Sequence, residues 1–181
     1  MRARFLAVSL AVSVLACLCA AQPVAARLWK PTPDQIATDY VSIIHIKGTE
    51  GRVMINWVSS QVVPSPALKP ILDKYVVVSI IHTRPGTGGS PTWDEVQGVQ
   101  VSDGSGQALK EVTKDSMPPM LIGLIATSDA TMRQSTQGNG RIYWGVWEAG
   151  PISACQKGRL VVNYDGEAYS FDTPLPSCGK P

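Results

Sequence analysis

Short runs of alternating apolar and polar residues dominate the chain and predict β-strands. Each run is rich in β-branched and aromatic residues and is bounded by glycine, proline, asparagine or aspartate, as strands usually are. No run keeps a helical apolar period over three turns, so only short helical turns are expected. The runs are DYVSIIHIK, GRVMINWVSS, KYVVVSIIHT, QGVQVS, QALKEV, MLIGLIAT, RIYWGVW, GRLVVNY and EAYSFDT.

About nine short antiparallel strands predict an all-β fold. The expected architecture is an immunoglobulin-like β-sandwich with one or two short helical turns. The candidate starts of these turns are Thr32–Pro33, Ser65–Pro66 and Ser90–Pro91. Residues 128–140 are almost wholly polar and are interpreted as a mobile loop. Residues 27–181 are numerous enough for one compact domain with a real core.

The last two runs predict a hairpin that turns at Asp165–Gly166. Glycine adopts positive φ freely and aspartate nearly does, so this pair favours a two-residue turn. The resulting register separates an apolar face from a largely polar one, and a shift by one residue would mix them. It pairs Leu160 with Phe171, Val162 with Tyr169, Arg159 with Asp172, Val161 with Ser170 and Asn163 with Ala168.

Residues 1–26 have the pattern of an export signal. Two arginines precede a short apolar stretch, and small residues lead up to Ala26 as a signal peptidase requires. The apolar stretch is too short for a membrane anchor, so we expect cleavage and export of residues 27–181, into the periplasm or out of the cell. The sequence VLAC, which ends at Cys17, resembles a bacterial lipobox and leaves a lipid-anchored form open as the alternative.

Charge and cysteine content fit an exported domain. The sequence holds 16 lysines and arginines against 14 aspartates and glutamates, and cleavage after Ala26 removes two of the arginines. Balanced, scattered charge argues against a nucleic-acid partner, and a membrane partner is expected only with lipidation at Cys17. Cys155 and Cys178 lie beyond the open end of the predicted hairpin, where an oxidising compartment would join them in a disulfide.

The only two histidines end two copies of the sequence VSIIH, at His45 and His82. Two histidines are too few for a closed zinc site, so the favoured interpretation is two similar strands that end in ordinary histidines. The alternative is a copper- or zinc-handling protein, in which Met117 and Met120 of the segment MPPM supply thioether ligands.

The segment RIYWGVW carries the best candidate binding surface. Strand alternation places Tyr143 and Trp147 on one face and Trp144 on the other, and only one face of a sandwich strand normally meets the core. Exposed aromatic side chains beside a polar loop are typical anchors for a partner. With Arg141 they form the predicted partner-binding set; the alternative is a central strand that is covered on both faces.

The chain shows no nucleophile elbow and no phosphate loop, and its histidines lie inside strand patterns. We therefore do not expect an enzyme, and the sequence implies no cofactor. The prediction is an exported, non-enzymatic binding domain that recognises a protein, peptide or sugar partner through the aromatic strand and the adjacent polar loop.

Overall fold

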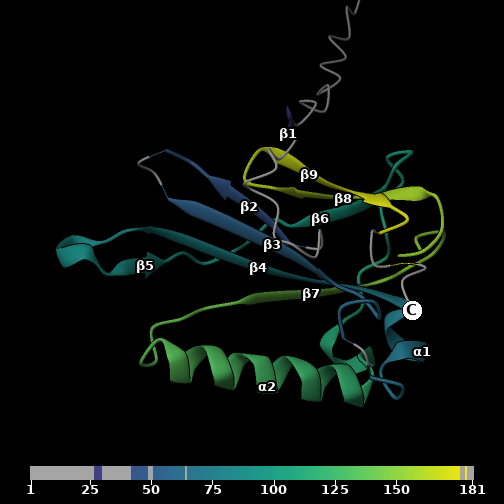
Figure 1. Ribbon diagram of the computed structural model, residues 1–181, viewed down its shortest axis with the longest axis horizontal. Helices are drawn as coiled ribbons and strands as arrows, with labels where there is room; N and C mark the ends of the chain where they lie inside the picture. Colours follow the sequence, from purple (N-terminus) through teal and green to yellow (C-terminus); the bar gives the residue numbers. More distant parts are fainter. Residues whose placement is uncertain (1–26, 30–41, 49–50, 64, 176–177, 179–181) are drawn as a thin grey trace, which may run out of the picture.

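Two β-sheets and one long helix form three stacked layers (Figure 1). The computed structural model describes residues 27–29, 42–48, 51–63, 65–175 and 178. The predicted signal peptide at residues 1–26, with Cys17, lies outside the described residues. Among the described residues, strands predominate over helices and the sheets are mainly antiparallel, which confirms the all-β prediction.

The upper layer in Figure 1, here called the hairpin sheet, has the strand order β1-β9-β8-β6. Its strands are β1 (Arg27–Trp29), β6 (Gln100–Asp103), β8 (Gly158–Tyr164) and β9 (Glu167–Thr173). β8 and β9 form the predicted hairpin, and all five predicted residue pairs are confirmed. β1 pairs with β9 in parallel, so the expectation of purely antiparallel strands is wrong at this edge.

The middle layer, here called the central sheet, is built around the long strand β4. Its strands are β2 (Ser42–Ile46), β3 (Arg52–Val58), β4 (Tyr75–Pro85), β5 (Pro91–Trp93) and β7 (Tyr143–Glu148). β3 pairs along one edge of β4, while β7 and β5 share the other edge, opposite 75–80 and 83–85 respectively. The valine- and isoleucine-rich start of β4 is buried on both faces, as a covered central strand requires.

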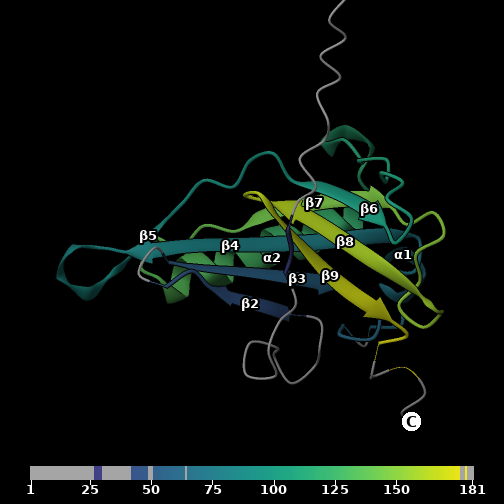
Figure 2. The same ribbon diagram turned by 90° about the horizontal axis from the view of Figure 1, so that it is seen from above.

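The main core lies between the two sheets, whose strands cross obliquely (Figure 2). Alternate side chains of β3 and β4 meet those of β8 and β9, and the ring of Trp57 meets that of Phe171 edge-on, with centroids 6.0 Å apart. The buried set includes Ile43, Val53, Ile55, Trp57, Val76, Val78, Ile80, Val101, Trp147, Leu160, Val162, Tyr164, Tyr169 and Phe171.

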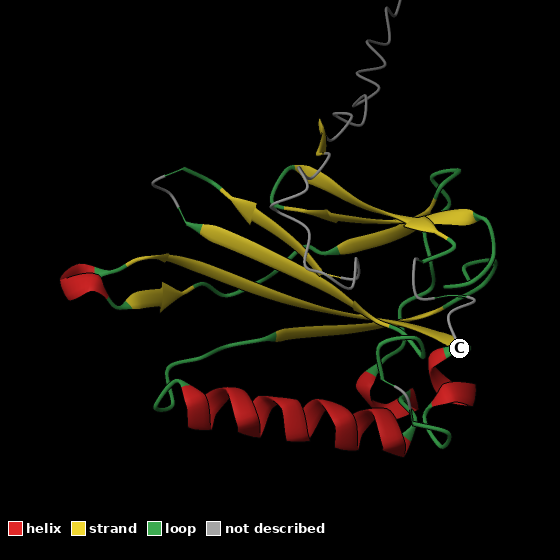
Figure 3. Cartoon of the chain, viewed as in Figure 1, coloured by secondary structure: helices red, strands yellow, loops and turns green. Residues whose placement is uncertain are grey.

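A second, smaller core lies between the central sheet and helix α2 (Pro119–Ser135). Leu121 of the helix is fully buried against Val77 of β4 and Val146 of β7. Figure 3 shows α2 running beneath the central sheet on the side opposite the hairpin sheet. One face of the central sheet is therefore covered by the hairpin sheet and the other by helix α2.

Helix α2 corrects two predictions. The run MLIGLIAT is helical and not a strand, and most of the predicted mobile loop at 128–140 is the second half of the same helix. Pro118 and Pro119 start the helix, and Leu121, Leu124 and Ile125 recur at the spacing that points one face toward the sheet. Hydroxyl side chains donate to carbonyl oxygens one turn earlier along the polar half, which satisfies them inside the helix.

The remaining elements are short. The predicted helical turn after Ser65–Pro66 is present as α1 (Lys69–Leu72), and single turns η2 (Thr87–Gly89) and η3 (Lys114–Ser116) follow. The turn predicted after Ser90–Pro91 is wrong, since that segment begins strand β5, and the one at Thr32–Pro33 lies outside the described residues. The run QALKEV is not a strand, since it forms only two isolated bridges. The predicted disulfide joins Cys155 to Cys178, so the base of the β8–β9 hairpin is covalently closed.

Candidate functional site

The aromatic strand β7 lies between two layers. Trp147 is only 2% exposed and packs in the main core, with Tyr143 half-buried against the same cluster. On the opposite face, Trp144 packs against α2, and its indole Nε1 donates a 2.9 Å hydrogen bond to Oδ1 of Asp129 in that helix. Both faces of the strand are therefore covered, which is the alternative that the sequence left open.

Arg141 supports the turn that leads into β7. Its guanidinium donates to the backbone carbonyls of Gly138 and Gly140, at 2.9 and 3.0 Å. These bonds satisfy carbonyl oxygens between the end of α2 and the strand. Of the four predicted partner-binding residues, the structure thus places Trp147 in the core, Trp144 under the helix, Tyr143 at the core margin and Arg141 in a turn.

The two histidines share one face of the central sheet but do not meet. His45 of β2 and His82 of β4 are both aligned with Val53 of the intervening strand β3. Two strand spacings separate their backbones by about 10 Å. Each imidazole instead reaches a tyrosine of the hairpin sheet: His45 Nδ1 lies 3.1 Å from the hydroxyl of Tyr169, and His82 Nδ1 lies 2.8 Å from that of Tyr164.

His82 belongs to a longer polar chain at the end of the main core. Its Nε2 lies 3.5 Å from Oδ2 of Asp94, and the same carboxylate oxygen forms an ion pair with Nε of Arg84 at 2.5 Å. The nearby carboxylate favours a proton on Nε2, so Nδ1 accepts the hydrogen bond that the Tyr164 hydroxyl donates. The order Tyr164, His82, Asp94 has the form of a catalytic triad.

The burial of Tyr164 and His82 argues against that role. Burial raises the pKa of Tyr164 to about 12, and the nearby carboxylates of Asp165 and Asp94 act in the same direction. Burial likewise raises the pKa of Tyr169 well above its usual range. A nucleophile must reach its substrate, whereas Tyr164 and His82 are each only 6% exposed. The raised pKa values keep both phenols protonated at neutral pH, as hydrogen-bond donors.

The structure does not gather the residues of the predicted metal site. Met117 packs against the second core, on the face of the central sheet opposite the histidines, and Met120 is exposed at the start of α2. Within the described residues, no group of three or more histidine, cysteine, aspartate or glutamate side chains is positioned to hold a metal ion.

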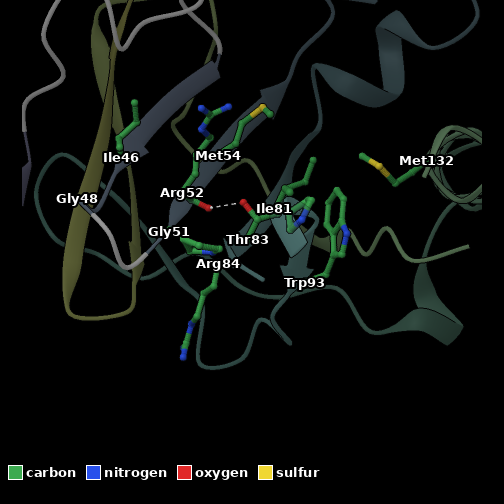
Figure 4. A pocket seen from close by; sticks show the side chains of 13 residues that line it. Ile46, Gly48, Gly51, Arg52, Met54, Ile81, Thr83, Arg84, Trp93 and Met132 are labelled. Carbon is green, nitrogen blue, oxygen red and sulfur yellow. Dashed lines mark hydrogen bonds between the residues drawn. The ribbon is translucent and has the colours of Figure 1, made fainter. Parts of the chain in front are cut away.

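A groove of about 530 Å³ with a mainly apolar lining lies on the outer face of the central sheet (Figure 4). Its floor consists of two rows of side chains that strand pairing aligns. One row runs from Met54 of β3 to Ile81 of β4, and the other follows Ile46, Arg52, Thr83 and Trp93 across four strands. Met132 of α2 reaches toward these rows and forms the opposite wall.

The groove exists because α2 covers only part of the sheet. The buried contacts of the helix are with the beginning of β4 and with β7, whereas Ile81 and Thr83 lie near the far end of β4. Gly51 lets β3 approach β4 at this end, since a Cβ there would overlap the carbonyl oxygen of Thr83. Apolar side chains on the outward face are thus left beside the helix without being covered by it.

Sequence reasoning missed every residue of this groove. A signal was present, because β3 and β4 carry apolar residues at outward positions such as Met54 and Ile81, where a strand facing solvent would be polar. That pattern indicates a second apolar face but does not show which element covers it, or how far.

Comparisons of the chain with protein-family models, with curated proteins and with solved structures find no match. Among the described residues, no helix combines the length and the apolarity that crossing a membrane requires.

Proposed function

We propose that this protein is an exported, non-enzymatic binding protein that holds a small, mainly apolar molecule in the groove between α2 and the outer face of the central sheet. The observation that carries the proposal is the lining of the groove: Ile46, Met54, Ile81, Trp93 and Met132 surround about 530 Å³. Cavities of this size with an apolar and aromatic lining are typical small-molecule sites.

The polar groups in the groove are few, which favours an apolar ligand over the sugar that the sequence left open. The two floor rows carry the polar groups of Arg52 and Thr83 and the indole N–H of Trp93, and the side chain of Arg84, which also borders the groove, is directed away from it (Figure 4). A sugar site would need several hydrogen-bonding groups, whereas an apolar molecule needs only to fit between the methionine, isoleucine and tryptophan side chains.

Export is supported by the disulfide. Cys155 and Cys178 are joined, and such bonds persist in oxidising compartments. An immunoglobulin-like strand order stays a prediction, since a sandwich of this kind does not by itself define the connectivity. The proposed function is argued from the groove and does not depend on an immunoglobulin-like fold.

The proposal is tested with a neutral apolar fluorophore, N-phenyl-1-naphthylamine, added to the purified chain from residue 27. We expect its emission to rise and saturate. We also expect the indole ¹H–¹⁵N resonance of Trp93, assigned with a Trp93→Phe variant, to shift while that of the buried Trp57 does not. Saturation without any change at Trp93 would place the fluorophore elsewhere and contradict the proposal.

A matched pair of methionine variants on α2 sharpens this test. Met132→Gln puts a polar group of similar size into the groove wall and is expected to weaken binding about tenfold, the equivalent of roughly 1.4 kcal/mol. Met120→Gln makes the same change at the exposed start of the helix and is expected to leave affinity unchanged. Equal effects in the two variants would show that the groove is not the binding site.

A further inference from the structure

Arg52 is a cation set among apolar side chains on the floor of the groove. It is the first residue of β3 and shares the outward face with Met54 two positions later. Its strand neighbours in the same row are Ile46 and Thr83. Figure 4 shows its side chain rising beside that of Met54.

Arg52 differs from the cations around it because they already have partners. Lys47 pairs with Asp165 at 2.5 Å, and Arg84 pairs with Asp94 at 2.5 Å. Among the described residues, no carboxylate forms an ion pair with Arg52, and none lines the groove. The single acidic residue of α2, Asp129, accepts the hydrogen bond from Trp144.

Arg84 also borders the groove, but its charge is directed elsewhere. It lies one residue beyond Thr83, the strand partner of Arg52, so alternation sends its side chain to the opposite face of β4. There it meets Asp94 beside His82. Figure 4 shows the Arg84 side chain directed away from the methionine and tryptophan side chains of the groove.

We infer that the ligand of the groove is a single-chain amphiphile with a carboxylate head group, which Arg52 holds while the apolar chain lies over Met54 and Ile81 toward Met132. This rests on the proposed function and names its ligand class. A guanidinium matches a carboxylate in shape and can bind it through two hydrogen bonds, and Arg52 is exposed and therefore accessible to a ligand. The floor of the groove supplies a cation at one position and apolar contacts along the rest.

The test compares two probes with the same ten-carbon chain and opposite head groups, decanoate and decyltrimethylammonium, each below its micelle concentration and at neutral pH. Affinities are measured by displacement of N-phenyl-1-naphthylamine. We expect the native protein to bind decanoate at least tenfold more tightly, and this preference to shrink at high ionic strength.

Two arginine variants show whether Arg52 causes the preference. Arg52→Gln is expected to bring the affinity ratio of the two probes to about one. Arg159→Gln removes a positive charge from β8, outside the groove, and should keep the ratio. Arg52→Lys retains a positive charge and should keep part of the preference, which guards against a glutamine variant that merely misfolds. Thermal unfolding of each variant is recorded alongside.

The outcomes separate this inference from the proposed function. Displacement of the fluorophore by both probes with equal affinity, or an unchanged preference in a folded Arg52→Gln variant, would overturn the carboxylate inference and leave an apolar groove. A fluorophore that neither binds nor shifts Trp93 would overturn the proposed function, and the inference with it.

Discussion

Gly145, in the middle of β7, makes room for a neighbouring tryptophan. A Cβ at this position would overlap the ring of Trp147, so the indole lies over the bare glycine backbone. Trp147 is fully packed in the main core and cannot easily move aside. The glycine in RIYWGVW is therefore needed for packing between the layers rather than for a turn. It also helps to explain why Trp147 points inward.

Gly145→Ala is expected to destabilise the protein by about 1–3 kcal/mol, because the added methyl group overpacks the core. The measurement is urea unfolding followed by circular dichroism. Gly123→Ala is the control: Gly123 lies in α2 with nothing near the added Cβ, so alanine should stabilise the helix by about 0.5–1 kcal/mol. A Gly145 variant as stable as the native chain would contradict this account of the strand.

At the scale of elements, the residue pairing of the β8–β9 hairpin could be predicted from the sequence, whereas helix α2 could not. The β8–β9 register follows from one strong turn and one buried face, and both are visible within sixteen consecutive residues, 158–173. In α2, Leu121, Leu124 and Ile125 lie within a run that is also apolar at Met120 and Ile122, so a short stretch is ambiguous between strand and helix. The central sheet settles the choice, because it offers one apolar face for the helix to cover.

Two adjacent leucine and isoleucine positions test which face of α2 is covered. Leu121→Ala is expected to lower the free energy of unfolding by about 2–5 kcal/mol, since Leu121 is fully buried between Val77 and Val146. Ile122→Ala changes an exposed position and should cost less than about 1 kcal/mol. Chemical denaturation of both variants measures the difference, and similar losses would mean that the helix packs in another orientation.

For the whole molecule, the main core is closed at one end by hydrogen bonds between layers. His45 and His82 of the central sheet each contact a tyrosine hydroxyl of the hairpin sheet. The shared face of the two histidines could be anticipated from strand alternation, but their tyrosine partners could not. The groove could not be predicted either, because its floor and wall combine four strands and a helix that are far apart in the chain.

The raised pKa of Tyr164 predicts a loss of stability in alkali. Its pKa moves from 10.0 to about 12 on folding because the phenol is buried. The resulting stabilisation is fully present below pH 10, the value for the unfolded chain, and is lost as the pH rises through about 12. Over that window the native protein should lose up to about 3 kcal/mol more than a Tyr164→Phe variant.

Urea unfolding at a series of alkaline pH values provides the measurement. The phenylalanine variant starts from a lower stability at neutral pH, because His82 loses the hydrogen bond from Tyr164. The comparison is between the slopes of the free energy of unfolding against pH for the native protein and the variant. If the two curves stay parallel from pH 10 to 12, the Tyr164 hydroxyl is not held away from water in the folded protein.

The late position of β7 in the chain determines which intermediate is most vulnerable during folding. The edge of β4 at residues 75–80 is completed only by residues 143–148, which follow α2. Until then a valine- and isoleucine-rich strand presents unpaired amides and carbonyls, the kind of edge that recruits other chains into cross-β aggregates. Pairing across so long a separation is also slow. We therefore expect an unfinished or unfolded chain to aggregate through this strand, and the pairing of β7 with β4 to remove that risk.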